Sequence, residues 1–230
     1  MKLFLMLIIA SCTYIYASVI GTVEELQGNV KVKPQNSIKK IKVLAGYQIQ
    51  EGDILSTYED GCAKIKLEDN STLIVDTDSM VRFISGVDLK QENGKVYYKI
   101  TSKKTKDALK VETNFAIIGI KGTTFIVKAD EQKELLLQEG VVGINSIKEE
   151  FELYRKKINA EFEDFKAKQQ QGFDEYKAAF EKYEKAVKTQ AFDLQQQNKV
   201  SFEDNIVKED SFDQNDADEF KYFEKLFDKN

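Results

Sequence analysis

Two different spacings of apolar residues divide the chain near residue 145. Before that point, short runs such as residues 29–33 and 63–67 alternate polar and apolar side chains, as expected for a strand with one face against a core. Turn-forming residues at 51–53, 69–71 and 92–94 separate the runs. The pattern predicts an all-β domain over residues 18–145, a roll or sandwich of short strands with solenoid-like character.

After residue 145 the apolar residues follow a helical spacing. Ser146 and Glu149 have the spacing of a capping box, and apolar positions then recur at intervals of three or four. Pairs of aromatic or apolar residues repeat at an interval of 11, which keeps one stripe along a helix. We therefore expect a long amphipathic helix over residues 146–200, able to form a coiled coil. Its stripe contains Phe151, Tyr154, Phe162, Phe165, Phe173, Tyr176, Phe180 and Tyr183.

Two further segments complete the tail. Residues 201–216 are rich in acidic and polar side chains, which predicts a solvated linker. The segment lacks the ligand set and the glycine of an EF-hand loop, so we expect no calcium site there. Residues 217–230 form a short amphipathic helix in this scheme, with Phe220, Phe223 and Phe227 on one face.

The aromatic stripe of the tail needs a partner, and three kinds remain open. It could self-associate or pack on the β domain, lie in a groove of another envelope protein, or lie on a lipid surface. The polar face mixes both charges, which disfavours lipid. We therefore take the stripe and the three phenylalanines at the C-terminus as a candidate partner or homo-oligomer surface.

The first 17 residues have the parts of a secretory signal peptide. Lys2 precedes the apolar run at residues 3–10, and Ala17 offers a small residue for cleavage. The run is too short to span a membrane, which takes about 20 residues. We expect export to the periplasm. The alternative is a membrane-anchored lipoprotein, because residues 9–12 resemble a lipobox in which Cys12 is lipidated.

Composition removes several function classes. With 42% hydrophobic residues, neither complete disorder nor a multi-span membrane protein fits. A net charge of −5 gives no basic excess for a nucleic-acid backbone. The chain has no His, which excludes a Ser-His-Asp triad and a HExxH zinc site.

Several spaced motifs resemble the FecR domain of bacterial envelope proteins. They begin at residues 21–32, continue through 50–57, 60–75 and 93–96, and close with 111–127 and 138–142. The resemblance covers about residues 19–144. The motif residues to which we assign a structural role are Gly52, Asp53, Thr57, Gly61, Asp69, Gly94, Gly122, Thr123, Phe125 and Gly140.

The resemblance implies a non-enzymatic periplasmic module that binds proteins and needs no cofactor or metal. We expect an interaction or scaffold role in the cell envelope. The alternative is an accessory role in transmembrane signalling, with sigma-factor regulation exerted through a separate membrane partner. An enzyme would have to rely on Asp53, Asp60, Asp69 and Asp76, but aspartate is common at such turns for backbone reasons.

Overall fold

The computed structural model describes residues 18–101, 109–155 and 186–227. Within them the chain forms two large β-sheets. The first sheet runs in the order β17 (Val187–Thr189), β16 (Phe151–Arg155), β20 (Ile206–Ser211), β19 (Asn198–Glu203), β14 (Lys133–Glu139), β13 (Thr124–Ala129), β10 (Lys95–Lys99), β7 (Thr72–Val75), β6 (Cys62–Leu67), β1 (Val19–Gln27) and β4 (Gln48–Gln50). The second runs β18 (Ala191–Gln195), β15 (Val141–Asn145), β12 (Ile117–Ile120), β11 (Leu109–Glu112), β9 (Asp88–Asn93), β8 (Met80–Phe83), β5 (Ile54–Thr57), β2 (Val30–Lys33) and β3 (Ile41–Lys42).

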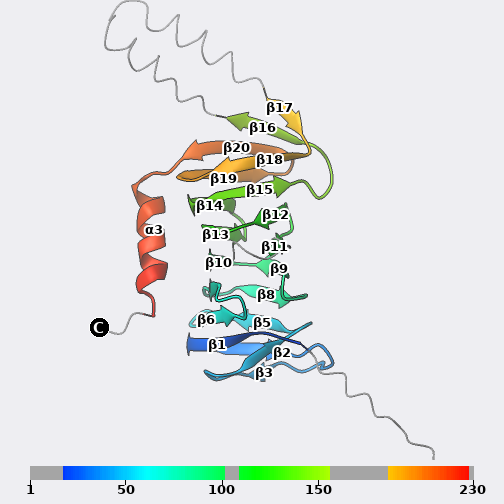
Figure 1. Cartoon of the computed structure of the whole chain (residues 1–230), viewed down its shortest axis with the longest axis vertical. Coiled ribbons are helices and arrows are strands. Elements are labelled where there is room, and N and C mark those ends of the chain that lie inside the picture. The colour runs from blue at the N-terminus through cyan, green and yellow to red at the C-terminus, as the bar shows by residue number, and fades with distance from the viewer. Residues whose placement is uncertain (1–17, 102–108, 156–185, 228–230) are drawn as a thin grey trace, which may run out of the picture.

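The strands lie across the long axis of the molecule and stack one above another, with β1–β3 at one end and β16 and β17 at the other (Figure 1). Most neighbours pair antiparallel, while β9 with β11 and β16 with β20 pair parallel. The chain repeatedly leaves one sheet after one or two strands and continues in the other. The two sheets are therefore built together along the sequence.

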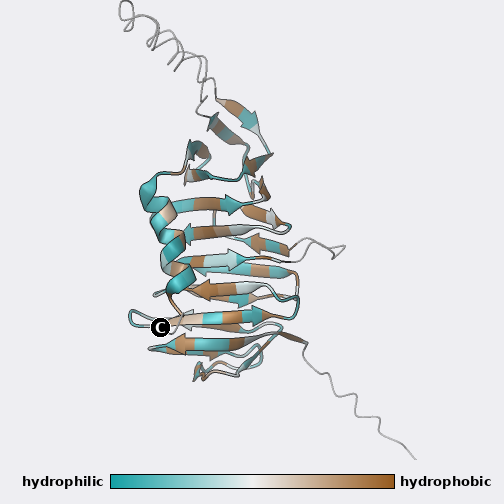
Figure 2. Ribbon diagram, turned by 60° about the vertical axis from the view of Figure 1, so that its left-hand side comes forward, coloured by the Kyte–Doolittle hydropathy of each residue, from teal (hydrophilic) through white to brown (hydrophobic). Residues whose placement is uncertain are grey.

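Alternation along many of the strands directs one set of side chains into the space between the sheets. In β6, Ala63, Ile65 and Leu67 are buried, while Lys64 and Lys66 are only partly covered. Both sheets contribute to the same interior, and the alternation appears as bands of apolar and polar ribbon in Figure 2. At its centre the rings of Tyr98 and Phe125 stack with centroids 4.7 Å apart. The all-β character predicted for the first part of the chain is confirmed.

A buried amide joins the two sheets through polar contacts. Gln91 on β9 is fully buried, and its Nε2 donates to the carbonyls of Gly94 (2.8 Å) and Val127 (3.0 Å). Its Oε1 accepts from the hydroxyl of Tyr98 at 3.0 Å. Because all these groups are removed from water, losing one partner would leave others unsatisfied at a cost of about 1–3 kcal/mol.

The long helical tail predicted from the sequence is wrong. Residues 151–155 form β16, and residues 187–203 contain β17, β18 and β19, so the sandwich continues well beyond residue 145. No coiled coil is present in the described part of the tail. The predicted stripe residues from Phe162 to Tyr183 lie outside the described residues.

The physical reason lies in two ambiguous signals. Phe151 and Leu153 are two residues apart and both are buried, as are Phe192 and Leu194; a strand satisfies this spacing, although Phe151 and Tyr154 also fit a helix. The turns give no glycine signal either, because the left-handed positions are occupied by Gln197 (φ 62°) and Asp204 (φ 54°).

The N-terminal cap and the linker expected in the tail are replaced by other structure. The Ser146 hydroxyl accepts from the backbone N–H of Lys148 (3.2 Å) and donates to the carbonyl of Glu149, within an irregular turn. The segment expected to be an acidic linker, 201–216, holds the end of β19, all of β20 and the first residues of α3 (Gln214–Lys225). Its acidic residues lie partly at strand positions that face solvent.

The hairpin at Gly94 provides a test of this architecture. Gly94 has φ +79°, and an added Cβ would lie 2.1 Å from Ser79 Oγ and 2.6 Å from Ser79 Cα. Gly46 has φ +89° with no atom within 4 Å of such a Cβ, so it is a matched control. We expect Gly46→Ala to lose about 1–2 kcal/mol from backbone conformation alone, and Gly94→Ala to lose about 1–3 kcal/mol more from the collision. Urea unfolding measures both, and equal losses would contradict the packing described at Ser79.

Candidate protein-interaction surface

The outer face of the first sheet carries an apolar surface that α3 covers. Four side chains form it, one from each of the consecutive strands β7, β10, β13 and β14: Ile74, Tyr97, Ile126 and Leu136. We call this set the helix seat. α3 lies across these strands rather than along them, on the side away from the second sheet (Figures 1 and 2).

Two phenylalanines of α3 fill the helix seat. Phe220 and Phe223 are fully buried, and both contact the ring of Tyr97, at centroid distances of 6.2 Å and 5.6 Å. Phe212, just before the helix, stacks on Phe220 at 5.6 Å. Burial raises the pKa of Tyr97 to about 12. Burying a side chain of this size contributes about 1.5–3 kcal/mol, so the two phenylalanines dominate the attachment.

The N-terminus of α3 is fixed to β19. Asp213 caps the helix by accepting from the backbone N–H groups of Asn215 (2.8 Å) and Asp216 (3.1 Å), and Asp216 returns the contact to the N–H of Asp213 (2.8 Å). Lys199 Nζ lies 2.8 Å from Asp216 Oδ2 and 3.3 Å from Asp213 Oδ2. A lysine of β19 thus pairs with both aspartates of the capping box and ties the start of the helix to the sheet.

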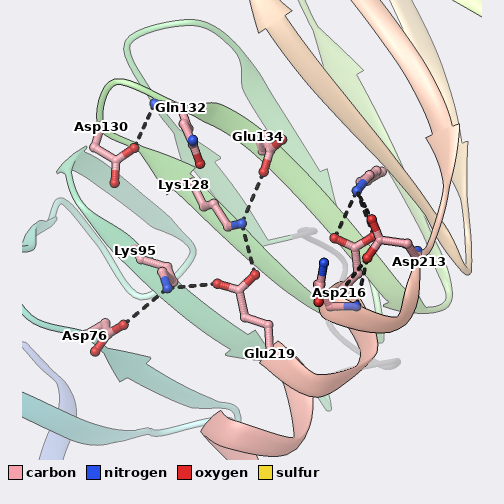
Figure 3. A network of polar contacts seen from close by, with 11 residues as sticks. Asp76, Lys95, Lys128, Asp130, Gln132, Glu134, Asp213, Asp216 and Glu219 are labelled. Carbon is pink, nitrogen blue, oxygen red and sulfur yellow. Dashed lines mark hydrogen bonds and ion pairs between the residues drawn. The ribbon is translucent and has the colours of Figure 1, made fainter.

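The middle of α3 is held by a half-buried ion network, shown in Figure 3. Glu219 accepts from Lys95 on β10 (2.8 Å) and Lys128 on β13 (2.9 Å). Lys128 also pairs with Glu134 (3.1 Å), and Lys95 lies 3.6 Å from Asp76. One carboxylate of the helix therefore bridges two neighbouring strands and fixes the position of α3 across the sheet.

The environment of Glu219 shifts its protonation in a defined direction. Burial raises the pKa of this carboxyl, but hydrogen bonds and charge from Lys95 and Lys128 outweigh burial and hold the pKa below its ordinary value. Burial likewise lowers the pKa of Lys128, and the bonds to Glu219 and Glu134 outweigh it, so the pKa of Lys128 is raised. Both groups are therefore held in their charged forms by the docked helix.

The candidate surface residues named from the sequence are separated by the fold. Phe151 is buried between the sheets, where it contacts Phe192 and Phe202. Tyr154 is half-buried on β16. Phe220 and Phe223 lie on the opposite side of the first sheet, in the helix seat, and Phe227 is partly buried beside them. The described aromatic residues therefore do not form one continuous surface.

The motif residues occupy turns and core positions. Asp53 accepts from the backbone N–H of Gln50 (3.0 Å), Asp69 from that of Ser71 (2.9 Å), and Thr57 from that of Ser79 (2.9 Å). Among the motif glycines, Gly52, Gly94, Gly122 and Gly140 have positive φ. At Gly61, the carbonyl of Asn29 lies where a Cβ would be. Thr123 and Phe125 are buried.

The four aspartates considered as catalytic candidates lie in turns and in an ion pair. Asp53 and Asp69 are used in turns, Asp60 accepts from the backbone N–H of Asn29 (3.2 Å), and Asp76 faces Lys95. Among the described residues no group of three His, Cys, Asp or Glu side chains could hold a metal ion. No helix in the described part of the chain has the length and apolar character to cross a membrane.

The helix seat was missed at the sequence level, although a signal for it exists. Its residues stand in the middle of the apolar triplets 73–75, 96–98, 125–127 and 135–137. A strand with one solvated face alternates, so a continuous apolar run indicates a strand buried on both faces. The ion network could not be found this way, because Lys95, Lys128 and Glu219 meet only after the helix docks.

Comparison with known proteins places part of this surface in a family. Residues 53–143 match the family model described as FecR protein. These residues form a FecR domain. The resemblance inferred from the sequence is thus confirmed over β5 to β15, which include all four residues of the helix seat. α3 lies outside the FecR domain match.

Solved structures give a more distant likeness. Two crystal structures of a putative anti-sigma factor from Parabacteroides distasonis ATCC 8503 match with TM-scores of 0.46 and 0.48 and identities of 12% and 11%. The matches cover 70% and 73% of this chain, and 60% and 64% of the solved chains, so this chain spans less than two thirds of either. No curated protein matches the chain.

The ion network predicts how pH affects α3. Because the native pKa of Glu219 is lowered, the stability that Glu219 adds to the docked helix is complete above pH 4.5, the pKa in the unfolded chain. That stability is lost as pH falls through the native pKa. The native pKa of Lys128 is raised, so the stability that Lys128 adds to the docked helix is complete below pH 10.5 and is lost as pH rises through the native value.

We expect α3 to loosen in acid before the sheets unfold, measured by hydrogen exchange of its amides. Glu219→Gln should remove part of this acid dependence, and an unchanged profile would contradict the role of Glu219.

Proposed function

We propose that this chain is a non-enzymatic protein-interaction module of the bacterial cell envelope, whose FecR domain binds an amphipathic helix across its outer face. The observation that carries the proposal is the helix seat, which lies within the FecR domain and is filled by a helix from outside it. α3 acts as the resident occupant. A partner with a similar helix would compete with α3 for the same surface.

The chemistry of the helix seat defines the helix that it accepts. The apolar side chains favour two large residues one turn apart, as Phe220 and Phe223 are. Lys95 and Lys128 favour a carboxylate between them, as Glu219 supplies. A helix laid with its apolar face in such a groove is a common mode of peptide recognition. The partner helix should therefore be acidic and carry closely spaced aromatic or large aliphatic residues.

A second candidate function is an accessory role in transmembrane signalling, through a separate membrane protein. The FecR domain favours it, because this family is regulatory in character. In this scheme, exchange of α3 for a partner helix would be the signalling step. Regulation of a sigma factor would be one outcome of such a pathway.

The helix seat can be tested with the chain's own helix. Phe220→Asp with Phe223→Asp should detach α3 by burying charge, and a labelled peptide of residues 212–227 should then bind the variant. Unsubstituted protein should bind on the order of a hundredfold more weakly, because its own α3 occupies the seat. Fluorescence anisotropy measures both affinities.

Matched controls make this experiment decisive. A peptide with the same two aspartates should not bind. Adding Lys95→Ala and Lys128→Ala to the protein variant should weaken its binding of the unsubstituted peptide. Circular dichroism and sedimentation establish that the variant keeps its sheets and stays monomeric. A folded variant that does not bind the peptide would contradict a helix-binding seat.

We also propose a periplasmic location after removal of residues 1–17, with a lipoprotein anchored at Cys12 as the alternative. Cell fractionation with a C-terminal tag distinguishes them. We expect the protein in the periplasmic fraction, unchanged by Cys12→Ser. Recovery in the membrane fraction that is lost with Cys12→Ser would support lipidation instead, and recovery in the cytoplasm would contradict both.

A further inference from the structure

The end of the stack formed by β2, β3 and β4 is basic in an otherwise acidic protein. Between Leu26 and Gln50 the chain has no Asp or Glu but contains Lys31, Lys33, Lys39, Lys40 and Lys42, although the net charge of the whole chain is −5. We call these lysines, with Ile38, Ile41 and Leu44, the basic end. It lies apart from α3 and the helix seat, so its role does not depend on the proposed binding of a helix.

The fold concentrates this charge further. Lys31 and Lys42 stand directly opposite each other on β2 and β3. Lys31 and Lys40 both lie over the ring of Tyr58, with Nζ 5.2 Å and 5.5 Å from its centroid. Lys40 Nζ also lies 3.1 Å from Ser56 Oγ. Like charges placed opposite each other in a ladder are destabilising, so this arrangement carries a cost in the free protein.

No acidic side chain relieves that repulsion. Among the described residues, none of the five lysines has an ion pair, whereas Lys64, Lys90 and Lys110 elsewhere on the sheets each face a carboxylate. Two aspartates of the neighbouring turns are used otherwise: Asp53 accepts from Tyr47 and Gln50, and Asp60 accepts from Asn29. The basic end is therefore free to meet an external anion.

Apolar side chains project from the same segment. Ile38 is 93% exposed, Leu44 72% and Ile41 43%. An alternative explanation is that lysines on an edge strand prevent the sheets of two molecules from joining edge to edge. β3 is the edge of the second sheet. That explanation accounts for Lys42 on β3, but it does not account for Ile38 and Leu44, which are exposed to water beside the lysines.

We propose that the basic end docks on an anionic lipid surface. Lysines attracted to anionic headgroups, with aliphatic side chains entering the boundary with the acyl chains, are the usual elements of interfacial binding. The N-terminal end of the described chain lies at the same end of the stack, because the carbonyl of Ser18, the first described residue, accepts from the N–H of Glu51 beside β4. In the lipoprotein alternative, an anchor at Cys12, close in sequence to Ser18, would hold this end of the stack near the membrane. An acidic protein would be attracted by the lysines but would not require exposed Ile38 and Leu44.

Vesicle binding tests this proposal with protein starting at Ser18, which removes the apolar N-terminus and retains every described strand and α3. The protein is sedimented with vesicles of phosphatidylglycerol and phosphatidylethanolamine, and with vesicles of phosphatidylcholine. One variant carries Lys39→Glu and Lys42→Glu, and a second carries Ile38→Ser and Leu44→Ser. The matched control is Lys121→Glu with Lys148→Glu, two exposed lysines outside the basic end that form no ion pair with the described residues.

We expect binding to the anionic vesicles only, and weaker binding as salt rises above about 0.1 M. Each lysine near such a surface is worth about fivefold in affinity, so the charge reversal should cost at least tenfold and the control little. The serine variant should also bind more weakly. Equal binding by all variants, or no binding to anionic vesicles, would overturn the proposal. Binding that is insensitive to the serine substitutions, and is matched by polyglutamate, would overturn it in favour of an acidic partner.

Discussion

The interior shared by the two sheets is the constraint on which the rest of the molecule depends. Most described strands direct side chains into that space, and the chain passes between the sheets every one or two strands. Neither sheet can therefore form its core without the other. The same alternation leaves each sheet with an outer face, and the stack with two ends. The features that we connect with function lie on those remaining surfaces, the helix seat on an outer face and the basic end at one limit of the stack.

The attachment of α3 illustrates a division between apolar and polar contacts. Phe220 and Phe223 supply the burial that favours docking. Half-buried ion pairs add little net stability because the charges must lose water, but they are directional. Glu219 between Lys95 and Lys128 therefore determines where along the sheet the helix lies. This combination suits an occupant that must be specific and also exchangeable.

The two surfaces give the molecule distinct positions for two kinds of contact. The helix seat is apolar, lies beside Lys95 and Lys128 within the FecR domain match, and is occupied by α3. The basic end is formed by β2, β3 and β4, before the FecR domain match begins. A protein attached to a membrane through its basic end would hold the helix seat along its side, where a partner can approach. This is the arrangement that the proposed accessory role in signalling would use.

Sequence by itself determined strands such as β2 and β6, because their period-two alternation specifies them and turns such as the one at Gly94 separate such runs. It also determined the apolar face of the last helix. The region after residue 145 was decided by tertiary structure, because Phe151 and Leu153 fit a strand while Phe151 and Tyr154 fit a helix. Pairing of β16 with β17 and β20, and the shared interior, select the strand. The partner of α3 was decided in the same way, since a pattern along one chain shows that a face is apolar but not which surface covers it.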